Sequence, residues 1–205
     1  MEASLQYMGR PPRHGEDELL DAAVRLFAEG GARAVTMAAV AREAGAPSGS
    51  VYHRFADRSS LLAALWLRTV QRFHSGYLPV LAEEPPIEAA IRSTSYVIRW
   101  SRDHLEETQV LYAGKRAFGE AEWSAEHHAA AKETDQNLEH AWRGLLRRLR
   151  PATGQRTDEL LLVLVDLPYG ALRRYLEQGQ APPARTIDLV ARAARTLLSG
   201  GEADG

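Results

Sequence analysis

The amino-acid sequence predicts an all-α fold of about nine helices, and three observations support this class. Apolar residues recur at spacings of three and four along most of the chain, which is the period of an amphipathic helix. Glycine and proline fall mostly at the ends of these stretches, where they terminate or start helices. No stretch shows a convincing strand pattern. With 205 residues and 45% hydrophobic content, the chain can bury a sizeable core.

The expected helices follow the chain from one glycine or proline boundary to the next. Before residue 57, the pattern predicts a long first helix and two short ones. Gly76 and Pro79 are expected to end the fourth helix, and Pro168 is expected to kink the eighth near Leu164 to Asp166. The ranges of the longer helices are about 15–29, 57–75, a helix from Pro86 onward, 105–118, 122–150, a helix from Thr157 onward, and 183–199.

Composition excludes several classes of protein. The absence of cysteine removes disulfides and thiolate chemistry, and it suits a cytoplasmic location. The longest aliphatic run, 160–165, is far shorter than the ~20 residues of a membrane helix, and residues 1–14 lack a signal-peptide core. We therefore expect no contact with a membrane. The net charge of −2 argues against one large basic surface but allows a local one.

Residues 31–61 have the pattern of a helix-turn-helix. Thr36 can cap a short helix whose apolar residues recur at helical spacing, and Gly45 stands where the chain must turn. A second short helix begins near Pro47, with Val51 and Phe55 four residues apart on its inward side. The outward side carries small or polar residues: Ser48, Gly49, Ser50, Tyr52 and His53. One side of this helix is expected to pack, and the other to recognise a partner.

This stretch resembles the DNA-binding signature of tetracycline-repressor-like (TetR family) transcriptional regulators. The residues that carry the resemblance are Thr36, Ala41, Ala44, Gly45, Ser50, Val51, Tyr52, Phe55, Asp57, Arg58 and Leu61. The sequence departs from the family pattern at Ala46, where valine is commoner, and at Arg54, where histidine or tyrosine is frequent. Arg58 replaces the usual lysine and keeps its charge.

The resemblance implies recognition of double-stranded operator DNA. It assigns phosphate contacts to Thr36, Tyr52 and Arg58, which would fix the register on the backbone. The start of the second short helix, Pro47 to Ser50, together with His53, would lie against base edges in the major groove. Paired recognition helices imply a homodimer through the last two helices, on a palindromic site with half-sites about 34 to 36 Å apart.

The resemblance also implies a division of the chain into two domains and an arm. A flexible arm would cover 1–14, and the helix-turn-helix domain 15–60. A larger helical domain, 61–205, would bind a small-molecule effector and dimerise, with the fourth helix connecting the two domains. The most direct prediction is a repressor that leaves its operator when the effector binds.

Aromatic and polar residues of the larger domain are candidates for the effector site. Tyr96, Trp100 and His104 step by four along one helical face. Asp166 is a further candidate, because an acid within an apolar helix needs a partner. The other candidates are Tyr112, Trp123 and His127. Each of these aromatic residues also suits an ordinary core position, and the sequence leaves that alternative open.

Catalysis and metal binding have weak sequence support. His127 and His128 diverge by about 100 degrees on a helix, so they cannot easily share an ion. No glycine-rich phosphate loop or nucleophile elbow is found, and we expect no catalytic residue, metal or cofactor. Two alternatives remain open: a helical enzyme or carrier that retains a helix-turn-helix, and a DNA-binding protein whose larger domain only dimerises or docks a protein.

Overall fold

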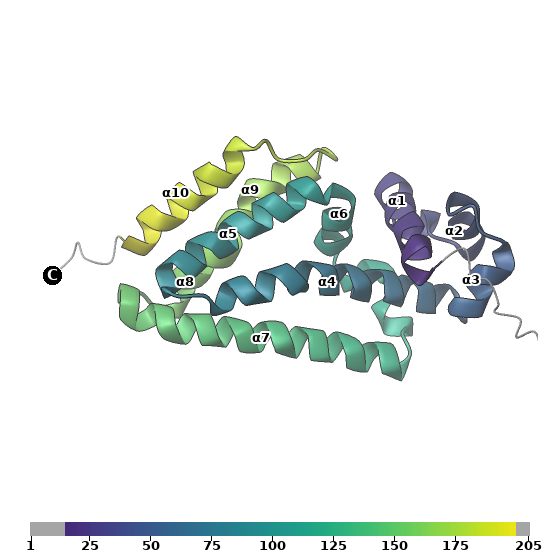
Figure 1. Ribbon diagram of the computed structural model, residues 1–205, viewed down its shortest axis with the longest axis horizontal. Coiled ribbons are helices and arrows are strands. Elements are labelled where there is room, and N and C mark those ends of the chain that lie inside the picture. The colour runs from purple at the N-terminus through teal and green to yellow at the C-terminus, as the bar shows by residue number, and fades with distance from the viewer. Residues whose placement is uncertain (1–14, 200–205) are drawn as a thin grey trace, which may run out of the picture.

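The computed structural model describes residues 15–199, and every regular element in that range is helical (Figure 1). The elements are α1 (Glu16–Ala34), α2 (Met37–Glu43), α3 (Ser48–Arg54), α4 (Arg58–Ala82), α5 (Pro86–Asp103), α6 (Leu105–Ala113), the 3₁₀ turns η1 (Lys115–Phe118) and η2 (Glu120–Glu122), α7 (Ala125–Thr153), α8 (Thr157–Leu161), the π-helical turn η3 (Leu162–Asp166), α9 (Leu167–Leu176) and α10 (Arg185–Ser199). Because α8, η3 and α9 are continuous, the described range holds the expected nine helices. The all-α prediction is confirmed. None of the described helices combines the length and apolar character needed to cross a membrane.

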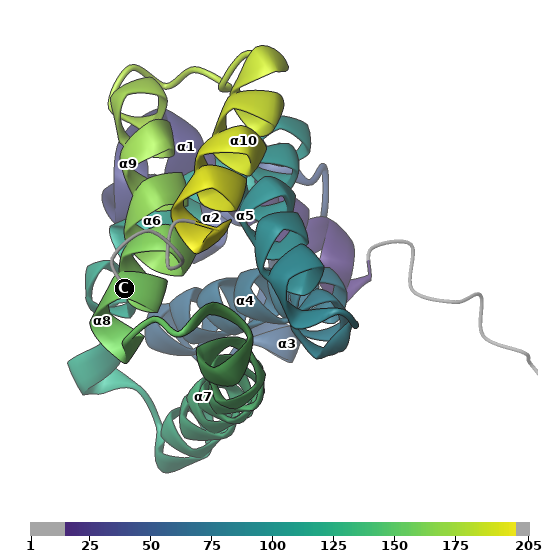
Figure 2. The ribbon, with the colours of Figure 1, turned by 90° about the vertical axis from the view of Figure 1, so that its left-hand side faces the viewer.

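The helices form an elongated molecule with the helix-turn-helix at one end. Figure 1 shows α1, α2 and α3 together at one end, and α8 with the last turns of α7 at the other. The long helices α4 and α7 lie side by side between these ends. Helices α9 and α10 pack against α5 and against each other (Figure 2). The predicted arm, 1–14, lies outside the described residues.

Helix α4 continues past the residues that were expected to end it. It runs to Ala82 through Gly76 and Pro79. Pro79 lies within the last turn of the helix, so it removes only one backbone hydrogen bond. Gly76 allows α5 to approach closely, because a Cβ added there would lie 2.3 Å from the Tyr96 hydroxyl oxygen. Packing against α5 and α7 therefore outweighs the local tendency of these residues to break a helix.

Three other helix ends differ from the sequence-based ranges. Helix α1 extends to Ala34 beyond an internal break, where Gly31 adopts a φ of 65° that favours glycine. Helix α6 ends at Ala113, and the chain then forms two 3₁₀ turns instead of continuing to residue 118. Helix α7 extends to Thr153, because Pro151 is tolerated in its last turn. The long-range packing of these segments is not visible in local sequence.

The irregularity expected before Pro168 is present. The backbone N–H of Leu167 bonds to the carbonyl oxygen of Leu162, so the turn has the wider π spacing. Since Pro168 has no N–H, the ordinary bond to Leu164 cannot form. The helix continues through this turn. Its side chains divide into a buried set (Leu160, Val163 and Leu164) and an exposed set (Leu161, Leu162 and Val165).

The core of the helix-turn-helix end includes side chains from the larger domain. Phe118 of η1 is fully buried and stacks on Phe27 of α1, with ring centroids 4.7 Å apart. Trp123 packs on Trp66 of α4 at 5.8 Å and donates its indole N–H to the Phe118 carbonyl oxygen at 2.9 Å. The segment between α6 and α7 thus anchors α1 to α4. The three N-terminal helices share one hydrophobic core with the larger domain.

Candidate DNA-binding surface and ligand pockets

The turn between α2 and α3 is built by a cap and a glycine. The hydroxyl oxygen of Thr36 accepts a hydrogen bond from the Ala39 N–H at 3.1 Å, which caps α2. Gly45 adopts a φ of 62°, and this lets the chain reverse before α3. Val51 and Phe55 are buried in the hydrophobic core that also contains residues of α1 and α2. These contacts hold α3 by one side only.

The opposite side of α3 is open to solvent. Tyr52 is 60% exposed, which is unusual for a large aromatic side chain. Pro47, Ser48, Gly49 and His53 are also exposed, and Ser50 is half-buried. Short side chains at the start of α3 leave its backbone accessible to a groove. The structure therefore brings six of the eight predicted DNA-binding residues onto α3 or its first turn, with Thr36 capping the preceding helix.

Arg58 has partners within the protein. Its Nε donates to the Val35 carbonyl oxygen at 2.9 Å, and one Nη donates to the Ala32 carbonyl oxygen. These carbonyls end α1, so the guanidinium caps that helix from the first turn of α4. Asp57 caps α4 by accepting the Ser60 N–H at 2.7 Å, and this hydrogen bond lowers the pKa of its carboxyl group. The geometry assigns Arg58 a positioning role that the sequence did not indicate.

Replacing Arg58 with lysine tests this role, because lysine keeps the charge but cannot bridge two carbonyls. We expect the free energy of unfolding to fall by about 1 kcal/mol, the net value of a typical hydrogen bond. Urea denaturation followed by circular dichroism measures the change. Arg42→Lys, at an exposed arginine of α2, is the control. Equal stability of both variants and the wild type would mean that Arg58 acts through charge alone.

Two of the predicted effector residues belong to an aromatic cluster between α4 and α5. Tyr96 donates its hydroxyl hydrogen to the Phe73 carbonyl oxygen at 3.2 Å. Trp100 is buried and meets the Phe73 ring edge-on at 5.1 Å. Tyr77 stacks on Phe73 from the same helix at 4.9 Å. These rings fill the space between the helices, so they serve as core rather than as the lining of an open pocket.

The other predicted effector residues are scattered. Trp123 lies in the core of the helix-turn-helix end, and His127 contacts the Ser124 hydroxyl at the start of α7, with 2.9 Å between Nδ1 and Oγ. Tyr112 stacks on Tyr169 of α9 at 5.4 Å, and its hydrogen bond to Tyr169 raises the pKa of the Tyr112 hydroxyl. Asp166 is exposed, so water solvates its carboxylate and no buried partner is required. The structure does not bring these residues together.

A pocket of about 410 Å³ lies between α1, α4 and α6 and contains His104. Its wall carries a buried carboxylate, Glu107, which lies 3.1 Å from His104 Nδ1 and 3.1 Å from an Arg72 nitrogen. Arg68, also on α4, pairs with Asp21 of α1 at 2.7 Å. Charged contacts thus join three helices where the helix-turn-helix meets the larger domain.

A second pocket, of about 320 Å³, lies between α4 and α7. It is lined by Gln71, His74, Ser75, Leu78, Ala130, Glu133, Thr134 and Asn137. His74 is almost fully buried, and this burial lowers the pKa of its imidazole, which is therefore mostly neutral at pH 7. The sequence did not indicate this pocket, because most of its lining residues are small or polar and not aromatic. The sequence signal that could have indicated the pocket is His74, because it is a polar residue on the buried face of a helix.

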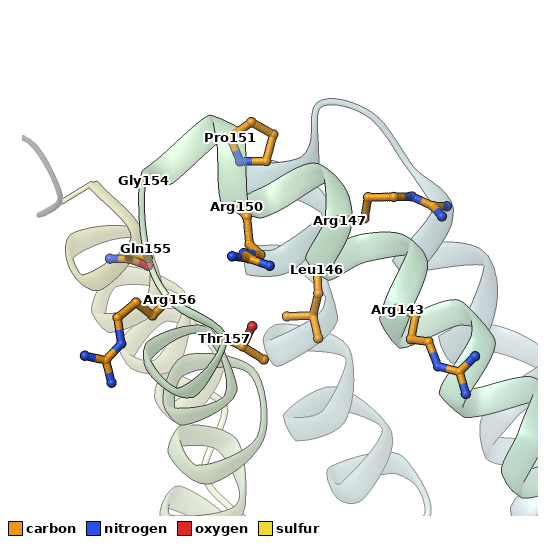
Figure 3. Close-up of a pocket in the computed structure, with 9 residues that line it drawn as sticks. All are labelled: Arg143, Leu146, Arg147, Arg150, Pro151, Gly154, Gln155, Arg156 and Thr157. Atoms are coloured by element: carbon orange, nitrogen blue, oxygen red, sulfur yellow. The ribbon is translucent and has the colours of Figure 1, made fainter.

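A third pocket lies between the end of α7 and the start of α8 and is lined largely by arginines (Figure 3). Among residues 15–199, no group of three or more histidine or acidic side chains is arranged to hold a metal ion. The described pockets therefore differ in chemistry: one carries mixed charges, one is polar and one is basic.

Comparison with known proteins finds relatives that share the helix-turn-helix segment containing α3. Residues 19–65 match the model of the bacterial regulatory proteins of the tetR family. Over 196 residues, the chain is 27% identical to the HTH-type transcriptional repressor KstR2 of Rhodococcus jostii (strain RHA1), covering 90% of this chain and 89% of that protein.

Solved structures share the fold over nearly the full length. The regulator PfmR of Thermus thermophilus matches with a TM-score of 0.68 and 20% identity, covering 91% of this chain and 99% of that one. The ketosteroid transcriptional regulator KstR2 of Mycobacterium tuberculosis matches with a TM-score of 0.66 and 21% identity, covering 90% and 93%. The helix-turn-helix signature, the sequence relative and the shared fold agree with one another: residues 19–65 match the tetR family, and the chain resembles the DNA-binding transcriptional regulators of that family over nearly its full length.

Proposed function

We propose that the protein is a transcriptional repressor that acts in the cytoplasm. In this proposal it binds a palindromic operator as a homodimer and is released by a small-molecule effector. The observation that carries the proposal is the solvent-facing side of α3, where Tyr52 is exposed beside His53 and the small residues Ser48 and Gly49. The relative from Rhodococcus jostii is named a repressor, which supports repression over activation for this protein.

A homodimer is supported by an exposed apolar face on the last helices. The exposed apolar residues of these helices are Leu161, Leu162, Val165 and Tyr169 on the continuous α8–α9 helix, and Leu189 and Leu197 on α10. Within the described residues, Tyr52 is the one other large hydrophobic side chain with comparable exposure. Apolar side chains gathered on adjacent helices are typical of a protein interface. A two-fold axis through this face would present two copies of α3 to one duplex.

The effector site that we propose is the polar pocket between α4 and α7. Its volume of about 320 Å³ is within the range of small-molecule sites, and its lining includes His74 from α4 and Thr134 from α7. The related structures include a ketosteroid regulator and a fatty acid degradation regulator. The polar lining of this pocket matches a ligand with hydrogen-bonding groups.

Helix α4 can transmit an effector's influence to α3. At its start, Arg58 holds the last carbonyls of α1. At its end, Arg148 of α7 donates to the Glu83 carbonyl oxygen at 2.8 Å and also to that of Leu81. A ligand that separates α4 from α7 would shift a helix fixed at both ends. By linkage, operator DNA must then weaken effector binding by the same factor.

Selection from a randomised pool of duplex DNA tests the proposed function, and we expect a palindromic site to be enriched. Tyr52→Phe should then weaken binding roughly fivefold on every sequence, because one phosphate hydrogen bond is lost. His53→Ala should change the base preference. Affinities are measured by fluorescence anisotropy at fixed salt, since salt alone changes them. His140→Ala, at an exposed histidine of α7, is the control. If no palindrome is enriched, or if both histidine variants behave alike, the proposal fails.

A further inference from the structure

The arginine-lined pocket has a chemistry that operator binding does not use. It has a volume of about 610 Å³ and lies between the last turns of α7 and the start of α8. Its lining residues are Arg143, Leu146, Arg147, Arg150, Pro151, Gly154, Gln155, Arg156 and Thr157 (Figure 3). Four of the nine are arginines and none is acidic. In a protein whose net charge is −2, this concentration of positive charge is local.

Two of the four guanidinium groups are not neutralised by the protein. Arg143 pairs with Glu139 at 2.6 Å, and Arg156 is held by both carboxylate oxygens of Asp158. Arg147 and Arg150 form no ion pair with any carboxylate in the range 15–199. Unpaired arginines that share a concave surface attract anions more strongly than scattered surface charges do.

The spacing along α7 places three arginines on one face. Arg143, Arg147 and Arg150 follow one another at four and three residues, so together they span about 10 Å of helix. In Figure 3, the Arg150 side chain points into the hollow between the two helices, toward the Thr157 hydroxyl, while Arg147 and Arg143 extend to the right, away from Thr157. A guanidinium presents a fork of N–H donors that matches two oxygens of a phosphate group.

Operator DNA is not a suitable occupant. Helix α7 contains 29 residues and is therefore about 40 Å long, and the pocket is at the end of the molecule opposite α3 (Figure 1). A duplex held by α3 does not reach this end. The occupant is therefore a separate and smaller anion.

We propose that this pocket binds a small molecule carrying at least two phosphate groups. Arg150 and Thr157 would hold one phosphate within the hollow, and the exposed Arg147 side chain would turn toward the hollow to hold the second. A single phosphate would leave one of the two free guanidinium groups unused. This inference does not depend on the proposed operator release, because the ligand need not be the effector.

Isothermal titration calorimetry of the full chain with inorganic pyrophosphate tests the site, in EDTA and at constant ionic strength. We expect pyrophosphate to bind at least tenfold more tightly than inorganic phosphate or sulfate. The double variant Arg147→Ala/Arg150→Ala should lose tenfold or more in affinity, as expected for charge-assisted hydrogen bonds. Arg147→Lys/Arg150→Lys should lose less, because charge is retained without the fork. Arg99→Ala, at an exposed arginine of α5 without an ion pair in the described chain, should bind as the wild type does.

Several results would contradict the proposal that this pocket binds a molecule with two phosphate groups. One is equal affinity for pyrophosphate and sulfate, which would indicate general anion attraction. Another is an unchanged affinity in the double alanine variant, with circular dichroism confirming that it is folded. Competition by a short duplex without operator sequence would assign the surface to nucleic acid instead. Operator binding by the double variant is measured in parallel and should be unchanged, so failure of this site and failure of the proposed repressor function give different results.

Discussion

Replacing Phe118 with alanine is expected to lower the free energy of unfolding by about 3–5 kcal/mol, the usual cost of emptying a buried aromatic site. The ring is fully buried and stacks on Phe27 of α1. Removing the ring leaves a cavity whose walls belong to the helix-turn-helix on one side and to the larger domain on the other. Guanidinium chloride denaturation, monitored by circular dichroism, measures the loss.

The control for this prediction is Arg116→Ala, because Arg116 lies in the same 3₁₀ turn but is exposed. Its effect should stay within about 0.5 kcal/mol of the wild type. Phe118→Leu should cost less than Phe118→Ala, since it leaves a smaller cavity. Similar stabilities for the alanine variants at 116 and 118 would show that the segment between α6 and α7 does not anchor α1.

The helix-turn-helix could be predicted from sequence because its signals are local. A cap at Thr36, a glycine at residue 45 and the inward pair Val51 and Phe55 each depend on neighbours within a few residues. The same local signals placed Ser48, Gly49, Tyr52 and His53 on the outward side of one helix. The assignment of individual base and phosphate contacts to these residues remains a prediction.

The larger domain was harder to predict because its features depend on distant partners. An aromatic residue such as Trp123 has the same sequence signature in a core as in a pocket, and only the contact with Trp66 decides between them. Arg58 carries the same charge whether it contacts a phosphate or the carbonyls of Ala32 and Val35. Gly76 did not end α4, because its missing side chain provides the space in which Tyr96 packs.

The apolar face of α8, α9 and α10 combines both kinds of information. The run from Leu160 to Val165 is apolar nearly all round a helix, a pattern that predicts burial on several sides. In the structure, half of these side chains are buried within the protomer and half are exposed. The exposed half includes Leu162, with 53% of its surface accessible. Such a division is expected when a second protomer covers the outer side.

Leu162→Glu is therefore expected to convert the proposed dimer into a monomer. A two-fold interface would bring the introduced carboxylate in from both protomers, and neither would have a partner for its charge. Size-exclusion chromatography with light scattering should show the monomer mass at micromolar concentration. Operator affinity should fall by about 10²- to 10⁴-fold, because each half-site would then be bound independently.

Gln136→Glu adds the same charge at an exposed position of α7 and is the control for this substitution. It should remain dimeric and bind the operator as the wild type does. Leu162→Met should also remain dimeric, since it keeps the apolar surface. A dimeric Leu162→Glu variant with unchanged operator affinity would move the interface elsewhere. A wild-type monomer at the same concentration would remove the basis for a palindromic operator, because two copies of α3 reach one duplex only when the protomers are held together.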